Sequence, residues 1–333
     1  MGKGVAVAVI AIALILIVVL AIAMSSQKHY YGTLKTPGVW EIKLGTLHRT
    51  SPPKTVTIRL SDVAWLVIKG SRAEVKINMS KYREVWLREN SGFCAEKECD
   101  AFFKNCRCLR WAKYVLNETN VTNSKVELIR VRFKVVNITR DLTSNSRLIT
   151  VKIPIIIPRG LVNIYDYNDN NTYVKHVLVP LMKYLSTSPK ELARNIADLI
   201  AQSGYNPKVA AAMFTIEEFL IRGGVCADWT AVAYTLRRYF NLTVVTATVH
   251  VGRSGEEHAF ALLCNTTWWR NGYGLRIYLR NGTMLECYAW VDTGYAFKYW
   301  DILKVDSIGG INERINKIEK LVNGRWIKVY PHD

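Results

Sequence analysis

The chain has little of several things on which other protein classes depend. It contains only two glutamines, Gln27 and Gln202, among 333 residues. Its 27 acidic residues are outnumbered by 45 lysines and arginines, yet no basic run exceeds two residues and no nucleic-acid-binding motif is present. A scattered basic surface without such a motif argues against a nucleic-acid partner. The scarcity of thermolabile glutamine is typical of a protein from a hot habitat.

Charge is missing altogether from one stretch near the N-terminus. Residues 5–24 read VAVAVIAIALILIVVLAIAM, and about 20 apolar residues are enough to span a bilayer as a helix. We therefore predict an uncleaved transmembrane signal-anchor over residues 1–25, in a single-pass protein of the cell membrane whose remaining chain lies outside the cytoplasm. A cleaved signal peptide is the alternative, because residues 21–23 (Ala-Ile-Ala) resemble a small-residue cleavage site.

Asparagine, unlike glutamine, is abundant and unevenly placed. Of 21 asparagines, eight begin an Asn-x-Ser/Thr sequon, which is more than chance predicts. These glycosylation candidates are Asn78, Asn117, Asn120, Asn137, Asn170, Asn241, Asn265 and Asn281. The excess predicts a glycosylated, exported surface, and with a hot habitat it suggests an archaeal cell surface. The net charge of +18 favours acidic partners such as lipid head groups, glycans or surface-layer glycoproteins.

An exported chain with seven cysteines is expected to pair six and leave one free. Four lie close together without a histidine among them, and two disulfides are favoured there over a zinc site. They are Cys94, Cys99, Cys106 and Cys108.

Cys264 and Cys287 lie on two strand-like segments whose antiparallel pairing would make them near neighbours. If that pairing also joins His258 to Asp292, strict alternation separates the cysteine faces, so their disulfide requires a β-bulge. Cys226 would then be the free thiol.

Two regions follow the apolar segment. Residues 26–160 are predicted to form a β-rich domain, because their segments alternate or run apolar with β-branched residues between breaks at Gly, Pro, Asn and Ser. Residues 161–333 are predicted to form a second, α+β domain. Its first helix covers residues 188–204, where Ser188 and Glu191 make a capping box around Pro189.

Further elements of the second domain are read from periodicity. A helix is expected at about 207–221, and another begins at Cys226 with an apolar stripe. Strands bearing His258 and Asp292 follow, the second entered from an Asn281-Gly282 hairpin turn of type I′. Residues 311–322 are predicted to be a final helix that ends at Asn323-Gly324.

A thiol, an imidazole and a carboxylate occur in this region in an order that suits nucleophilic catalysis. Cys226 follows two glycines and opens a helix, whose N-terminal dipole lowers a thiol pKa. His258 can accept the thiol proton and return it to a leaving group, and Asp292 can orient the imidazole. The backbone N–H of Cys226 is one candidate oxyanion donor. His250 is the rival base, and Asp301 and Asp306 are the alternative carboxylates.

The segments GGVCADWT, EEHAF and AWVDTG resemble the core of the transglutaminase-like superfamily, which includes transglutaminases, related cysteine peptidases and peptide N-glycanases. The similarity covers about residues 178–303 and includes Tyr205 and Pro207 upstream. The matching core positions are Gly224, Cys226, Asp228, Trp229, His258, Ala259, Phe260, Val291 and Asp292. Phe260 stands where Trp is usual, and Thr293-Gly294 replaces a common Pro. The resemblance implies a papain-like fold, with a Cys-bearing helix packed on an antiparallel sheet that carries His and Asp.

The sequence as a whole predicts an α+β fold class: an N-terminal transmembrane helix, a β-rich domain and a transglutaminase-like catalytic domain. The predicted activity is that of a thiol-dependent acyl hydrolase or transferase, either a peptidase or a crosslinking enzyme, on peptide or carboxamide bonds. The predicted catalytic residues are Cys226, His258 and Asp292. No cofactor and no metal are expected. Its partner would be a protein or peptide substrate, for example an acidic surface-layer glycoprotein. Trp229, Trp268 and Trp269 are candidates to rim the cleft. Glycan amidase activity, implied by the superfamily, and an inactive module that binds cell-surface glycoproteins are the alternatives.

Overall fold

The computed structural model describes most of the chain beyond residue 54. The described residues are 55–89, 93–98, 107–112, 124–135, 147–157, 171–209, 215–251, 256–294, 298–300 and 303–330. All of them belong to one compact unit, Thr55–Asp333, and a separate unit, Met1–Lys54, precedes it. The apolar residues 5–24 therefore lie outside the described residues. Among the residues that are described, no helix is long and apolar enough to cross a membrane.

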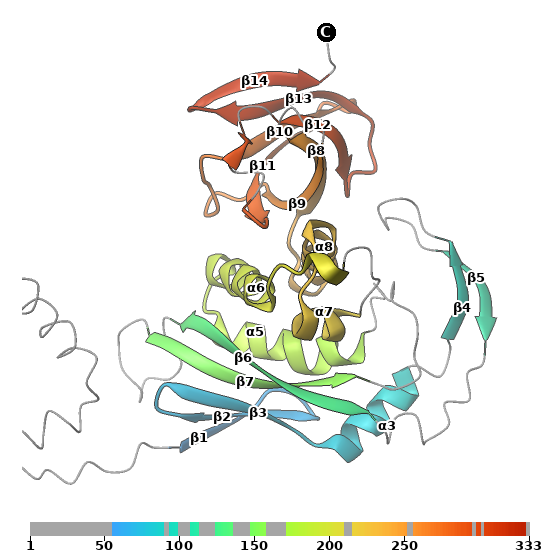
Figure 1. Ribbon diagram of the computed structural model, residues 1–333, viewed down its shortest axis with the longest axis vertical. Coiled ribbons are helices and arrows are strands. Elements are labelled where there is room, and N and C mark those ends of the chain that lie inside the picture. Colours follow the sequence, from blue (N-terminus) through green and yellow to red (C-terminus); the bar gives the residue numbers. More distant parts are fainter. Residues whose placement is uncertain are drawn as a thin grey trace, which may run out of the picture. The chain divides into compact units, whose positions relative to one another are not determined.

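A five-stranded sheet forms the first half of this unit (Figure 1). Its order is β1-β2-β3-β7-β6, antiparallel except where β3 runs parallel to β7. The strands are β1 (Thr55–Arg59), β2 (Ala64–Lys69), β3 (Arg72–Ile77), β6 (Lys125–Val135) and β7 (Arg147–Ile157). The strands predicted for this region are confirmed here. Apolar residues bury at least one face of β2, β3, β6 and β7, whereas those of β1 are only partly buried.

Helix α3 (Met79–Glu89) follows β3 and was not predicted from the sequence. The Asn78 side chain accepts a hydrogen bond from the Lys81 backbone N–H, which caps the start of the helix. At its end, Glu89 accepts hydrogen bonds from Thr172 and Lys175, at 3.0 and 2.8 Å. Strands β4 (Phe93–Glu98) and β5 (Arg107–Ala112) pair as a separate two-stranded sheet.

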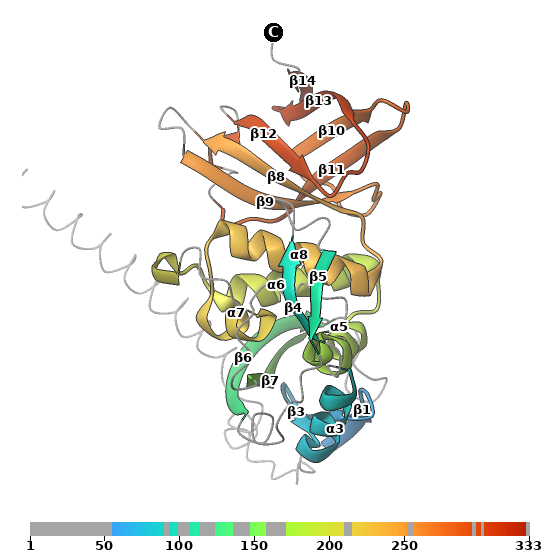
Figure 2. The same ribbon diagram turned by 90° about the vertical axis from the view of Figure 1, so that its right-hand side faces the viewer.

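Four α-helices form a layer that packs against two sheets (Figures 1 and 2). Helix α6 contacts β6 and β11, α7 contacts β7, and α8 contacts β8 and β9. The layer comprises η1 (Val174–Leu178, a π-helical turn), α5 (Val179–Leu185), α6 (Pro189–Ser203), α7 (Ile216–Arg222) and α8 (Cys226–Phe240). Buried residues of the five-stranded sheet and of the helices share one hydrophobic core, which also includes Trp290 and Val291.

The predicted helices at 188–204 and after Cys226 are confirmed as α6 and α8. Ser188 caps α6 by accepting from the Glu191 N–H, and an apolar stripe buries one side of each helix. The helix expected at 207–221 is only partly present. A 3₁₀ turn, η2, covers Pro207–Val209, and α7 begins at Ile216.

A seven-stranded sheet forms the second half of the unit, in the order β12-β8-β9-β11-β10-β13-β14. All of its pairings are antiparallel. The strands are β8 (Val244–Val251), β9 (Glu256–Cys264), β10 (Gly274–Leu279), β11 (Met284–Val291), β12 (Lys304–Gly309), β13 (Ile315–Val322) and β14 (Arg325–Tyr330). Successive side chains of β9 point to opposite faces of the sheet, and each face packs in a different hydrophobic core. Ala261 and Leu263 face the helices, whereas Phe260 and Leu262 belong to a second apolar cluster inside this sheet.

The helix predicted for residues 311–322 is wrong. Ile315–Val322 is strand β13, which pairs with β10 on one side and β14 on the other. Asn323 and Gly324 join β13 to β14 with positive φ at both residues (48° and 77°), the backbone of a type I′ turn. At Asn281-Gly282, where we predicted that turn, a hairpin forms but only Gly282 has a positive φ. Long-range pairing of a sheet outweighs a local helical pattern at 311–322.

The predicted α+β fold class is also wrong. More of the described chain lies in strands than in helices, with fourteen strands against five α-helices in the described part. The main reason is the C-terminal region, where the residues expected as a helix and their neighbours add β12, β13 and β14 to the sheet. The transmembrane helix that belonged to this predicted architecture has no counterpart among the described helices.

Candidate active site

Helix α8 begins at Cys226, and a local hydrogen bond fixes its first turn. The Asp228 carboxylate, three residues into the helix, reaches back and accepts from the Val225 backbone N–H at 2.9 Å. The Cys226 thiol is free and half-buried. Because the first N–H groups of a helix have no partner within it, the sulfur lies at a site that favours negative charge.

Two glycines let the chain turn sharply into this helix. Gly223 has a φ of +71°, and a Cβ atom there would lie 2.4 Å from the Gly204 carbonyl oxygen. A Cβ on Gly224 would lie 2.6 Å from the Cβ of Asp228. No side chain fits at either position without movement of the backbone or of the capping carboxylate.

The segment after α6 is tied to this turn. Gly224 donates its N–H to the Gly204 carbonyl at 3.2 Å, and Asn206 donates to the Gly224 carbonyl at 3.1 Å. The Trp229 indole also donates to the Gly204 carbonyl, at 3.2 Å. Residues 204–206 and the start of α8 therefore form one hydrogen-bonded support for Cys226.

His258 and Asp292 come from neighbouring strands of the seven-stranded sheet. His258 lies near the start of β9, and Asp292 follows the last residue of β11. Nε2 of His258 lies 2.5 Å from Oδ1 of Asp292. Cys226 hydrogen-bonds to the same imidazole. The three residues predicted from the sequence are thus brought together in one chain of contacts.

A β-bulge explains how these contacts coexist with the disulfide. The register of β9 and β11 shifts between Ala289 and Val291. Trp290 and Val291, although consecutive, both pack in the core shared with the helices. The extra residue returns Asp292 to the side of the sheet that Cys287 faces. Cys287 then lies directly opposite Cys264 in register, and the two form a disulfide, which confirms that predicted pair.

The electrostatics favour a thiolate beside an imidazolium. Burial by itself lowers the pKa of His258, but hydrogen bonds to Asp292 and Cys226 outweigh it and raise that pKa to about 9. Burial raises the pKa of the Cys226 thiol, but His258 and the backbone N–H groups of Ala259 and Ala227 bring it below its usual value. Each group therefore stabilises the charged form of the other.

Tyr205 also lies beside this site, although it was not predicted from the sequence as a site residue. Its side chain is 56% exposed, and its backbone forms an isolated β-bridge with Gly224 in the turn that precedes Cys226. Burial and the negative charges of Cys226 and Glu256 raise the pKa of the Tyr205 hydroxyl, which stays protonated at neutral pH. The only signal in the sequence was its match to the resemblance upstream of Cys226.

No protein-family model, curated protein or solved structure matches this chain. The site is therefore interpreted from its own geometry.

The other predicted site residues lie away from the thiol or serve the fold. His250 lies opposite Glu257 in register, one residue from the Val249–His258 pair, so it faces the other side of the sheet. Trp229 is 7% exposed and supports Gly204. Trp268 and Trp269 follow the end of β9 that lies away from His258. They pack edge to face, and the Trp269 indole donates to the Ala289 carbonyl. Asp301 and the side chain of Asp306 lie outside the described residues.

Four of the eight sequon asparagines are described, and all four are exposed at the ends of elements: Asn78, Asn241, Asn265 and Asn281. The others, Asn117, Asn120, Asn137 and Asn170, lie outside the described residues. Of the four clustered cysteines, Cys94 and Cys108 are on β4 and β5, and Cys99 and Cys106 lie outside the described residues. Their pairing stays a prediction.

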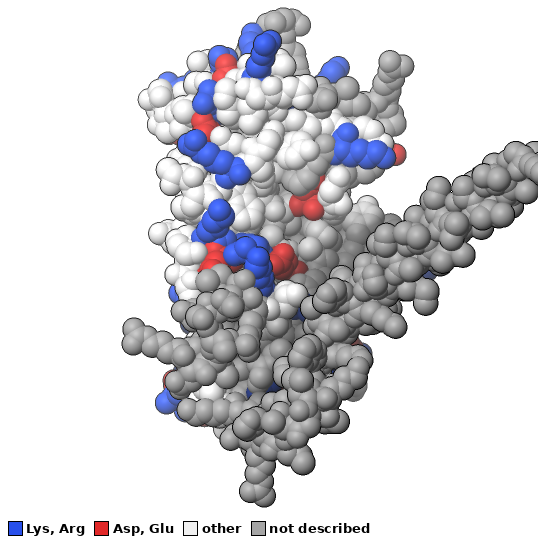
Figure 3. All heavy atoms as spheres, turned by 90° about the vertical axis from the view of Figure 1, so that its left-hand side faces the viewer, with Lys and Arg blue, Asp and Glu red and all other residues white. Residues whose placement is uncertain are grey.

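Surface charge is mixed over the face drawn in Figure 3. Basic and acidic side chains are interspersed on its described part, and the basic ones do not gather into one patch. This agrees with the absence of long basic runs from the sequence.

Proposed function

We propose that the protein is a thiol-dependent acyl hydrolase or transferase that acts on peptide or carboxamide bonds, with a transglutaminase-like active site. The observation that carries the proposal is the continuous contact from Cys226 through His258 to the buried carboxylate of Asp292. A free thiol at a helix start, an imidazole hydrogen-bonded to it and a carboxylate excluded from solvent are the parts that nucleophilic thiol catalysis needs.

The proposed reaction has two halves. The Cys226 thiolate attacks the substrate carbonyl carbon, and a C–S bond forms as the carbonyl π electrons move to oxygen. The tetrahedral intermediate collapses with loss of the amine, to which imidazolium His258 gives its proton. Neutral His258 then takes a proton from an attacking water or amine. Collapse of the second intermediate breaks the C–S bond, and the thiolate returns beside a protonated His258.

Charge that develops on the carbonyl oxygen needs donors. The backbone N–H of Cys226 lies in the first turn of α8, where helical N–H groups have no partner within the helix. The Tyr205 hydroxyl, near Cys226 and still protonated, is the second donor that we propose. Hydrolysis is the favoured outcome, because the exposed Tyr205 indicates a mouth open to water.

The disulfide and the exposed sequons support a site of action outside the cytoplasm. Disulfides persist in oxidising compartments, and Cys264–Cys287 holds together the two strands that carry His258 and Asp292. Glycans on the four exposed sequon asparagines would leave the core undisturbed. A protein or peptide at the cell surface is the substrate that fits this setting.

The proposal is tested by iodoacetamide alkylation of the native, non-reduced protein across pH, with peptide mapping. We expect Cys226 to react with a midpoint below about 8.5, the pKa of an unperturbed thiol. His258→Ala should move that midpoint upward, because burial raises the thiol pKa and the imidazole that lowers it is then absent. His250→Ala is the matched control and should leave it unchanged.

Two results would count against the proposal. If Cys226 resists alkylation in the folded protein, or is found in a mixed disulfide, the site is not a working thiol centre. A binding module for cell-surface glycoproteins would then be the better interpretation. If His250→Ala rather than His258→Ala moves the midpoint, the base has been assigned to the wrong histidine.

A further inference from the structure

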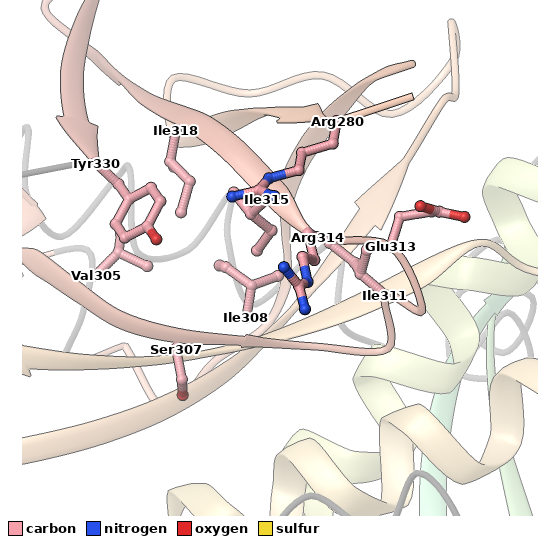
Figure 4. A pocket seen from close by; sticks show the side chains of 10 residues that line it. All are labelled: Arg280, Val305, Ser307, Ile308, Ile311, Glu313, Arg314, Ile315, Ile318 and Tyr330. Carbon is pink, nitrogen blue, oxygen red and sulfur yellow. The ribbon is translucent and has the colours of Figure 1, made fainter. Parts of the chain in front are cut away.

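The seven-stranded sheet curls until its two edge strands meet. Strands β12 and β14 contact one another, but they are the two ends of the sheet order and no described residues join them as a ladder. A hollow of about 390 Å³ opens along this seam (Figure 4). Small-molecule sites often lie at the mouths of curled sheets and have volumes of roughly 300–1,000 Å³.

The floor of the hollow is the apolar core of the sheet. Val305, Ile308 and Ile318 are 4%, 8% and 3% exposed and belong to the inner apolar cluster. Ile311 and Ile315 pack against that cluster and are only partly buried. The accessible apolar surface of the hollow therefore comes mainly from Ile311 and Ile315, with the buried cluster behind them.

Two arginines stand over this apolar floor. Arg280 donates its backbone N–H to the Arg314 carbonyl at 2.9 Å, so the two side chains leave the backbone from adjacent positions. Figure 4 shows both guanidinium groups directed over the isoleucines, and the Glu313 carboxylate directed away from them. Within the described part of the chain, neither arginine forms an ion pair with a carboxylate.

We propose that this seam binds a small amphipathic anion, a carboxylate attached to a compact apolar body. The guanidinium groups would bind the carboxylate with paired, charge-assisted hydrogen bonds, and the isoleucines and Tyr330 would cover the apolar body. Two neighbouring guanidinium charges repel one another, and a bound anion relieves that repulsion. A volume of about 390 Å³ lies near the small end of ligand sites, which suits a free small acid rather than a membrane lipid.

The site is separate from the thiol centre and does not rest on the proposed enzymatic function. Its residues come from β12, β13, β14, the connection between β12 and β13, and Arg280 just after β10. Cys226 and His258 instead lie at the start of α8 and of β9. Alkylation of Cys226 therefore serves as an internal check that a seam variant remains folded.

The test is photolabelling of the full chain with an eight-carbon carboxylate that carries a diazirine, followed by peptide mapping. We expect the label on residues of β12–β14, and we expect octanoate, but neither octanol nor octylamine, to compete. The double variant Arg280→Gln, Arg314→Gln should weaken the apparent affinity at least tenfold, because both charge-assisted contacts are lost. Arg72→Gln, an exposed arginine on β3, is the control.

The proposal would be overturned by labelling spread along the chain, by equal competition from octanol, or by an unchanged affinity of the double variant. Competition by octanol alone would identify an apolar hollow without anion selectivity. Competition by anionic lipid vesicles but not by octanoate would assign the seam to a membrane surface, which also contradicts the proposal.

Discussion

Nε2 of His258 and Oδ1 of Asp292 lie 2.5 Å apart, and their side chains are 5% and 0% exposed. The second carboxylate oxygen of Asp292, Oδ2, is buried and has no hydrogen-bond partner in the described part of the structure. The carboxylate is therefore committed to the imidazole. Burial by itself lowers the pKa of His258, but this carboxylate, together with the contact to Cys226, stabilises the imidazolium and raises that pKa to about 9.

Asp292→Asn removes this charge and should shift the pH dependence of turnover. Burial then lowers the pKa of His258, so the imidazolium that protonates the leaving amine is lost at a lower pH than about 9. The alkaline limb of kcat/KM should move to lower pH, and the maximum should fall about 10²-fold or more. The measurement is a pH–rate profile, with Asp62→Asn on the exposed surface as the control. An unmoved alkaline limb would show that Asp292 does not set the imidazole pKa.

Alkylation and turnover should respond differently to high pH in the unaltered protein. The thiolate forms as pH rises through the lowered pKa of Cys226 and then persists, so alkylation should rise to a plateau. Turnover also needs the imidazolium and should fall as pH passes about 9. Parallel profiles of iodoacetamide labelling and peptide hydrolysis check this. A matching decline in both would mean that the protein itself, rather than the general acid, is failing.

Gly223→Ala should distort the turn that leads from α7 to Cys226. The added Cβ would lie 2.4 Å from the Gly204 carbonyl oxygen at a φ of +71°, and such strain costs roughly 1–3 kcal/mol. We expect a lower free energy of unfolding and slower alkylation of Cys226. Gly272→Ala is the matched control, because nothing lies within 4 Å of its added Cβ. Equal stability of the two variants in urea would contradict the tight approach of residues 204 and 223.

Loss of the Cys264–Cys287 disulfide should destabilise the sheet that carries His258 and Asp292. The bond closes a segment with a sequence separation of 23, for which loop entropy predicts about 3 kcal/mol. Cys264→Ala with Cys287→Ala should lower the free energy of unfolding by about that amount, measured by urea denaturation of non-reduced protein. Dithiothreitol should destabilise the unaltered protein by about 3 kcal/mol more than the variant, because any pairs among the four clustered cysteines are present in both. The same response in both would place the redox-sensitive bond elsewhere in the chain.

Tyr205→Phe tests the hydroxyl at the mouth of the site. If it donates to the developing oxyanion, kcat should fall about 10²-fold with little change in KM, because the hydrogen bond strengthens only in the transition state. Tyr184→Phe on α5 is the control. A rise in KM with unchanged kcat would assign Tyr205 to substrate binding instead.

The sequence by itself determined the elements whose signals are local. Ser188 and the apolar stripe after Cys226 fixed α6 and α8, since caps and periodicity act within a few residues. Only the tertiary structure decided the rest. The helical pattern of 311–322 became β13 because partners on both sides pair with it. The side of the sheet that Asp292 faces depended on the bulge at Trp290. The Trp290 indole donates to the Ala193 carbonyl of α6 at 2.8 Å. Residues nearly a hundred positions apart set that register, and no local pattern carries such information.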